Sequence, residues 1–102
     1  MKQVLILSES VITEALTNLS DWRLEDGKLM AEFTLPDFDT AIELVNKVAA
    51  VSREMDHHPL MTNVYNRLLF SLSTHGVGDR VTQLDLDLAH RISLLINEDI
   101  TQ

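Results

Sequence analysis

Cysteine is missing altogether from the 102 residues of this chain. Disulfide bonds, thiolate nucleophiles and zinc–thiolate centres are therefore excluded, and any catalysis must use other side chains. Lack of cysteine fits a reducing compartment, and we expect a cytoplasmic location.

Basic residues are few. Lys and Arg number 8 against 16 Asp and Glu, which gives a formal net charge of -8. A surface of this sign repels a polyanion, so the sequence predicts no nucleic-acid partner.

Long apolar runs are also absent. No stretch approaches the roughly 20 residues that span a bilayer. The apolar run Val4–Leu7 near the start is too short for the core of a signal peptide. We therefore expect no membrane association.

The chain is predicted to form a single domain over residues 1–102. A domain of this size buries roughly 60–70% of its unfolded surface, so it needs no metal or disulfide to fold. No repeat, low-complexity tract or linker divides it, and its few prolines and glycines stand at predicted element ends.

The first part of the chain predicts a helix followed by a hairpin. Apolar residues recur at helical spacing over residues 11–19, and Ser8 or Ser10 can cap that helix. Residues 22–25 and 29–35 then alternate apolar and polar side chains. The Asp-Gly pair between them is a strong signal for a two-residue hairpin turn.

A long helix is predicted from its cap at Asp37 to the His57-His58-Pro59 segment, because the residue before proline avoids helical angles. Its predicted buried face consists of Phe38, Ala41, Ile42, Val45, Val48, Ala49, Ser52 and Met55.

A second strand pair is predicted over residues 61–65 and 67–73, with three alternate residues facing the core: Leu68, Phe70 and Leu72. Thr82–Asp85 then resembles a capping box with Asp in place of Glu, and an apolar stripe over residues 88–96 predicts the last helix.

This order of elements, α-β-β-α-β-β-α, predicts an α+β fold. Two hairpins form a four-stranded antiparallel sheet, and three helices cover one of its faces in a two-layer arrangement. So small a sheet leaves an edge or a face uncovered, and we expect another copy of the chain to pair there.

Three of the four histidines gather at the ends of the second predicted hairpin. His57 and His58 precede its first strand, and His75 follows its second. Because an antiparallel hairpin returns the chain to its starting point, these residues are expected to be neighbours. Imidazole exchanges protons near neutral pH, so the cluster suits general acid–base catalysis. Asp56 lies beside it and is a candidate to orient one ring.

Each feature has a simpler structural interpretation. The His-His-Pro segment can be a helix terminator, with His57 at the negative end of the helix dipole. A three-histidine metal site is a further alternative, although no i,i+4 ligand pair is present. His90 falls on the polar face of its helix, Trp22 suits a core anchor, and Asp85 suits a helix cap.

Several motifs together resemble the pterin-4a-carbinolamine dehydratases, a family also known as dimerisation cofactors of a homeodomain transcription factor. The specific combination is a histidine doublet, a tyrosine segment and a Thr-His pair, and the resemblance covers roughly residues 16–92. The matching segments are Leu19–Trp22, Phe38 with Ala41, Asp56–Pro59, Asn63–Asn66, Thr74-His75, Val81–Asp85 and Leu88-Ala89.

The resemblance implies an activity. Members remove water from 4a-hydroxytetrahydropterin to give quinonoid dihydropterin, without a metal or another cofactor. The reaction recycles the pterin used by aromatic amino acid hydroxylases. The resemblance also implies protomers that pair through their sheets into homodimers, which often join into homotetramers.

The resemblance carries over to individual residues. It implies that His57, His58 and His75 surround the pterin as catalytic residues. We expect His57 and His75 to form the proton-transfer pair and His58 to position the ring. The candidate substrate-binding residues are Asp56, Pro59, Trp22 and Asp85.

Two departures from the family pattern weaken the case for this activity. The family usually carries a carboxylate four residues before the histidine doublet, where this chain has Arg53, and Glu54 stands one helical position away. The loop from His75 to Thr82 is also about one residue longer than usual. The alternative function is a non-catalytic oligomeric scaffold or coactivator on the same fold.

Overall fold

The structure is a computed structural model, and it describes the backbone of residues 5–101 and the side chains of residues 5–98. Val4, the first residue of the short apolar run noted above, lies outside the described residues. In chain order the elements are α1 (Glu9–Leu16), β1 (Arg23–Glu25), β2 (Lys28–Thr34), α2 (Phe38–Met55), β3 (Leu60–Val64), β4 (Arg67–Leu72), the 3-10 turn η1 (His75–Val77) and α3 (Gln83–Thr101).

The four strands form one antiparallel sheet in the order β1-β2-β4-β3. The hairpins β1–β2 and β3–β4 are therefore joined side by side through β2 and β4, whose register places Ala31 opposite Phe70. This confirms the predicted α+β fold, and it leaves β1 and β3 as the two edges.

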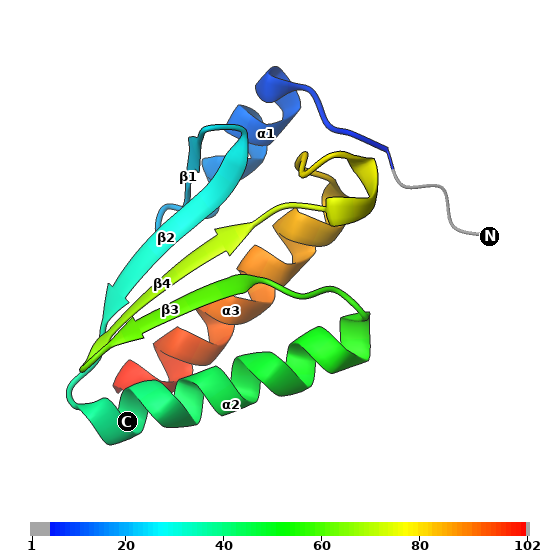
Figure 1. Cartoon of the computed structure of the whole chain (residues 1–102). Coiled ribbons are helices and arrows are strands. Elements are labelled where there is room, and N and C mark those ends of the chain that lie inside the picture. The colour runs from blue at the N-terminus through cyan, green and yellow to red at the C-terminus, as the bar shows by residue number, and fades with distance from the viewer. Residues whose placement is uncertain (1–4, 102) are drawn as a thin grey trace.

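One face of the sheet is covered by helices, with α2 and α3 running along it (Figure 1). The side chains on that face alternate along each strand as predicted. Leu29, Ala31 and Phe33 from β2 pack against Leu68 and Phe70 from β4 in a single core. Burial of every second side chain is what an antiparallel sheet with one wet face requires.

Helix α2 begins where the sequence predicted. The side chain of Asp37 accepts a hydrogen bond from the backbone N–H of Thr40 over 2.7 Å. The predicted burial of Phe38 was wrong, because this side chain is 44% exposed. The core begins one turn later at Ala41, so the first turn of the helix projects past it.

The buried stripe of α2 is also shifted from the prediction. Leu44 and Val51, which are not part of the predicted stripe, are buried, whereas Ile42, Val45 and Ala49 are only half-buried. Within the described part of the chain, no helix has the length and apolar character needed to cross a membrane.

Candidate active site

The site begins where α2 ends. Asp56 adopts the left-handed conformation with φ 51°, which stops the helix, and Asp is one of the few non-glycine residues that tolerate it. The backbone N–H of His57 then donates to the carbonyl of Ser52 over 3.0 Å. This reversal turns His57 inward, where it is 8% exposed, and leaves His58 exposed.

His57 is held by a carboxylate from another element. Its Nε2 lies 2.6 Å from Oδ1 of Asp85, in the first turn of α3. Asp85 is completely buried, as an acid is only when its oxygens are paired. The carboxylate that contacts the ring is therefore Asp85 and not Asp56, the candidate expected from the sequence.

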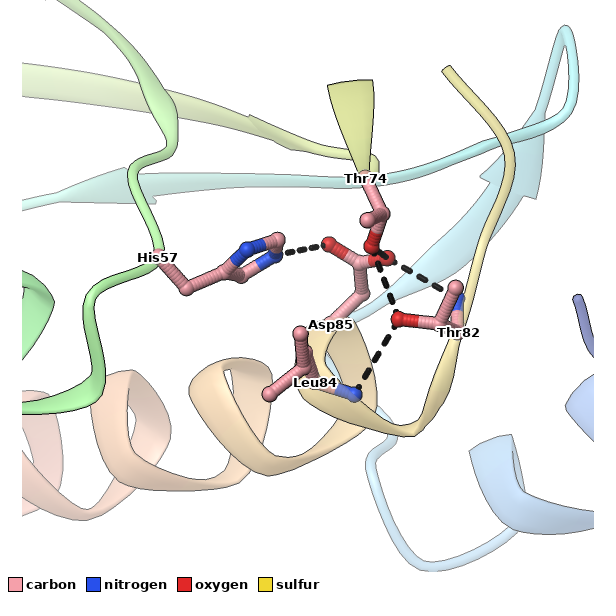
Figure 2. A network of polar contacts seen from close by, with 5 residues as sticks. All are labelled: His57, Thr74, Thr82, Leu84 and Asp85. Carbon is pink, nitrogen blue, oxygen red and sulfur yellow. Dashed lines mark hydrogen bonds and ion pairs between the residues drawn. The ribbon is translucent and has the colours of Figure 1, made fainter. Parts of the chain in front are cut away.

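The second oxygen of Asp85 accepts two hydrogen bonds (Figure 2). The backbone N–H of Thr82 donates to Oδ2 over 2.9 Å, which completes the predicted capping box. The hydroxyl of Thr74 donates to the same oxygen over 2.8 Å.

These contacts form a directed chain. Because the single hydroxyl hydrogen of Thr74 is given to Asp85, the 2.7 Å contact between Thr74 and Thr82 must have Thr82 as donor. Thr82 in turn accepts from the N–H of Leu84 over 3.3 Å. Every hydrogen in the network thus has one acceptor, which suits a buried polar cluster.

His75 comes from a different element. It opens η1, its side chain is 99% exposed, and its Nδ1 lies 3.3 Å from Oδ1 of Asp79. The loop after it closes on itself, because the N–H of Thr74 donates to the carbonyl of Arg80 over 2.8 Å. No hydrogen bond is made by the side chain of His58 to any part of the chain that the structure describes.

The three histidines line one open cleft of about 310 Å³, as the hairpin geometry predicted. The other residues of its wall are Asp56, Ser73, Thr74, Gly76 and Leu84. A neighbouring hollow of about 230 Å³ shares His58, Ser73 and His75 and adds Lys28. Within residues 5–98, no three His, Cys, Asp or Glu side chains converge as metal ligands would.

The candidate substrate-binding residues occupy different places. Asp56 lines the cleft, and Asp85 lies behind His57. Pro59 is half-buried and does not line the cleft. Trp22 is a core residue, 4% exposed, and its indole N–H donates to Ser93 over 2.8 Å. His90 is exposed on α3, as predicted.

The two residues at the departure from the family pattern, Arg53 and Glu54, are not among the residues that line the cleft. Glu54 forms an ion pair with Arg91 of α3, with 2.8 Å between Oε2 and Nη1. It therefore does not replace the carboxylate that the family carries one position earlier. Arg53 is exposed in the last turn of α2 and is not among the cleft residues.

Comparison with known proteins places this geometry in context. The family model described as "Pterin 4 alpha carbinolamine dehydratase" matches residues 6–95. A Metallosphaera sedula protein named "Putative pterin-4-alpha-carbinolamine dehydratase" is 44% identical over 89 residues, which are 87% of this chain and 92% of that protein. A protein of the same name from Solibacter usitatus is 40% identical over 89 residues, 87% of this chain and 93% of the relative.

Solved structures give the same assignment of fold. A transcriptional coactivator/pterin dehydratase from Brucella melitensis superimposes with a TM-score of 0.84 at 34% sequence identity. The match covers 89% of this chain and 98% of the Brucella chain. A pterin dehydratase-like protein identified as a RuBisCO assembly factor in the alpha-carboxysome superimposes at 0.63 and 19% identity, covering 74% and 88%. The latter shares the fold.

Proposed function

Because this chain belongs to the pterin 4 alpha carbinolamine dehydratase family, we propose that it removes water from a 4a-hydroxytetrahydropterin by histidine acid–base catalysis. The observation that carries the proposal is the single cleft lined by His57, His58 and His75. Its volume of about 310 Å³ is near the lower end of the ~300–1,000 Å³ typical of small-molecule sites.

The reaction needs one base and one acid. The base takes the proton from N5, and the electron pair of that N–H bond forms the double bond between N5 and C4a. The bond from C4a to its hydroxyl oxygen breaks as that oxygen takes a proton from the acid and leaves as water. No electron is gained or lost overall, so two imidazoles in opposite protonation states suffice.

The positions of the histidines support a division of labour. His57 is buried at the base of the cleft and tied to the protein by Asp85, while His75 stands on the η1 wall. We assign these two residues to proton transfer because they come from different sides of the cleft. His58, which is exposed and lines the same cleft, is assigned to positioning the ring.

The proposal extends to the biological setting. The product is the quinonoid dihydropterin, and the process served is recycling of the pterin used by an aromatic amino acid hydroxylase. The functional unit is a homodimer or homotetramer in the cytoplasm.

The decisive experiment is a dehydratase assay. The carbinolamine is generated enzymatically, and its loss is followed with and without purified protein, so that the spontaneous rate is the baseline. We expect acceleration that survives treatment with a chelator. Loss of activity on chelation and its return with zinc would replace the metal-free mechanism.

The competing function is a non-catalytic assembly module. Arg53 at the usual carboxylate position favours it. Absence of acceleration with any pterin carbinolamine, from protein shown to be folded, would make this module the function of the chain.

A further inference from the structure

Resting on the proposed function, we infer that Asp85 is a positioning residue that holds His57 in the Nε2–H tautomer, so that the unprotonated Nδ1 serves as the base toward N5 of the pterin. The assignment follows from accounting for each hydrogen in the buried network that joins α3, β4 and the end of α2.

The acceptor role of Asp85 comes first. Its Oδ2 receives two donors that cannot be reversed: the backbone N–H of Thr82 and the hydroxyl of Thr74. A carboxylate has no hydrogen to give, and its place in the first turn of α3 favours the negative charge. The hydrogen between Asp85 and His57 therefore belongs to Nε2 of the imidazole.

The tautomer of His57 follows from this. In a neutral imidazole only one nitrogen carries hydrogen, so a donor at Nε2 leaves a lone pair on Nδ1. Nδ1 points away from Asp85 (Figure 2), and it makes no hydrogen bond to any described residue. Because His57 lines the cleft, this lone pair is the one available to a ligand there.

Asp85 also prepares the charged state. When Nδ1 accepts the proton from N5, the imidazolium that forms is already 2.6 Å from a buried carboxylate. Hydrogen bonds to charged partners are stronger than neutral ones, so the contact strengthens as the proton is transferred. His75 then remains as the acid that protonates the leaving hydroxyl.

The substitution Asp85→Asn reverses this arrangement. The N–H of Thr82 is a fixed donor, so the amide must turn its oxygen toward Thr82 and its NH2 group toward His57. Nε2 then has to accept, and the hydrogen moves to Nδ1, where it blocks the base. The change keeps the size and shape of the side chain while it inverts the tautomer.

The test combines nitrogen NMR with kinetics. In the free protein, at a pH where the two ¹⁵N shifts of His57 show a neutral ring, they should report Nε2–H in wild type and Nδ1–H in Asp85→Asn. His57→Gln assigns the resonance. Asp85→Asn should lower kcat by about 10²–10⁴ with little change in KM, because the lost function belongs to proton transfer.

A matched control separates positioning from helix capping. Thr82→Val removes the hydroxyl that caps α3 by accepting a hydrogen bond from the N–H of Leu84. It keeps the backbone N–H that donates a hydrogen bond to Asp85. It should lower the melting temperature while His57 stays in the Nε2–H form. If Asp85→Asn lowered stability in the same way and left both the tautomer and kcat unchanged, Asp85 would be only a cap.

The wild-type spectrum alone can overturn the inference. A neutral His57 that carries its hydrogen on Nδ1 contradicts it, whether or not any variant folds. This readout needs no substrate, so it also stands apart from the dehydratase assay. Lack of activity would remove the proposed function, whereas the wrong tautomer would remove the role of Asp85.

Discussion

The hydroxyl of Thr74 donates to Oδ2 of Asp85 over 2.8 Å, and the next residue of the chain is His75. Asp85 therefore contacts two of the residues that line the cleft. It binds His57 directly, and it holds Thr74, the residue immediately before His75. A carboxylate at the start of α3 thus sets the spacing between the two histidines assigned to proton transfer. A shift of α3 would move both.

The first prediction concerns these two histidines. His57→Ala and His75→Ala should each lower kcat by about 10²–10⁴, the usual loss when a proton-transfer residue is removed. His90→Ala is the matched control, because His90 is exposed on α3 outside the cleft, and it should behave as wild type. Equal turnover in all three variants and wild type would remove the catalytic assignment.

His57→Ala has a second effect that must be separated. It leaves the buried Asp85 without its imidazole partner, which should lower the melting temperature as well as kcat. His57→Gln retains an N–H donor for Asp85 but no group that exchanges protons near neutral pH. It should recover part of the stability and none of the turnover.

The fold was predictable because its signals are local. Strict alternation over Leu29–Leu35 and Leu68–Leu72 marks strands with one buried face, and the chain reversal between β3 and β4 brings His58 and His75 together. These predictions need only the geometry of a strand and a hairpin.

The pairing of His57 with Asp85 was beyond such reasoning. The two residues are 28 positions apart, and their contact depends on how α3 packs against α2, which no local pattern encodes. The capping motif accounts for the hydrogen bond that Oδ2 of Asp85 accepts from Thr82, but it carries no signal for the contact between Oδ1 and His57. The predicted burial of Phe38 was wrong for a related reason, because the exposure of this side chain depends on where the core ends.

The second prediction concerns His58. Its side chain is exposed at the cleft and makes no hydrogen bond to the described residues, so it is free to contact the ring. His58→Ala should raise KM more than it lowers kcat, because a positioning contact is made in both ground and transition states. A loss confined to kcat would place His58 in proton transfer instead.

The third prediction concerns a substitution at position 53 that restores the family's usual carboxylate. Arg53→Glu should leave activity unchanged or raise it, because a carboxylate accepts the hydrogens that the amino group and ring nitrogens of a pterin offer. Arg53→Gln is the control for loss of the positive charge alone. The measurement is KM and kcat for the carbinolamine.

The same substitution can reveal a separate role for Arg53. A negative charge in the last turn of α2 opposes the helix dipole, so the melting temperature should fall slightly. If Arg53→Glu abolished activity while the protein stayed folded, the arginine would itself bind substrate, and the natural ligand would be more anionic than a simple pterin.

The fourth prediction concerns stability in acid. Hydrogen bonds from the side chain and backbone N–H of Thr40 hold the pKa of Asp37 below its usual value of 3.8. The folded state thus gains stability from this group above that value and loses it as the pH falls through the lower folded pKa.

The substitution Asp37→Asn isolates this contribution. Asparagine also caps helices but does not titrate. The difference in unfolding free energy between wild type and Asp37→Asn should be constant near neutral pH and should shift against wild type below the usual pKa of 3.8. Denaturant unfolding from about pH 6 to about pH 2 measures it, and a constant difference throughout would contradict the assignment.

The fifth prediction is a homo-oligomer assembled through β3. Among the residues that the structure describes, this strand pairs only with β4, which leaves its outer edge without a backbone partner there, and Leu60 and Val64 are 66% and 63% exposed. An edge of this kind accepts a second antiparallel copy of itself under two-fold symmetry.

Light scattering should give the mass of a dimer or tetramer at micromolar concentration. Lysine at both positions should shift the protein toward monomer, because charge on an edge strand blocks pairing, while Val11→Lys on exposed α1 should not. A wild-type monomer would refute assembly, and an unchanged mass in the double variant would exclude β3 as the interface.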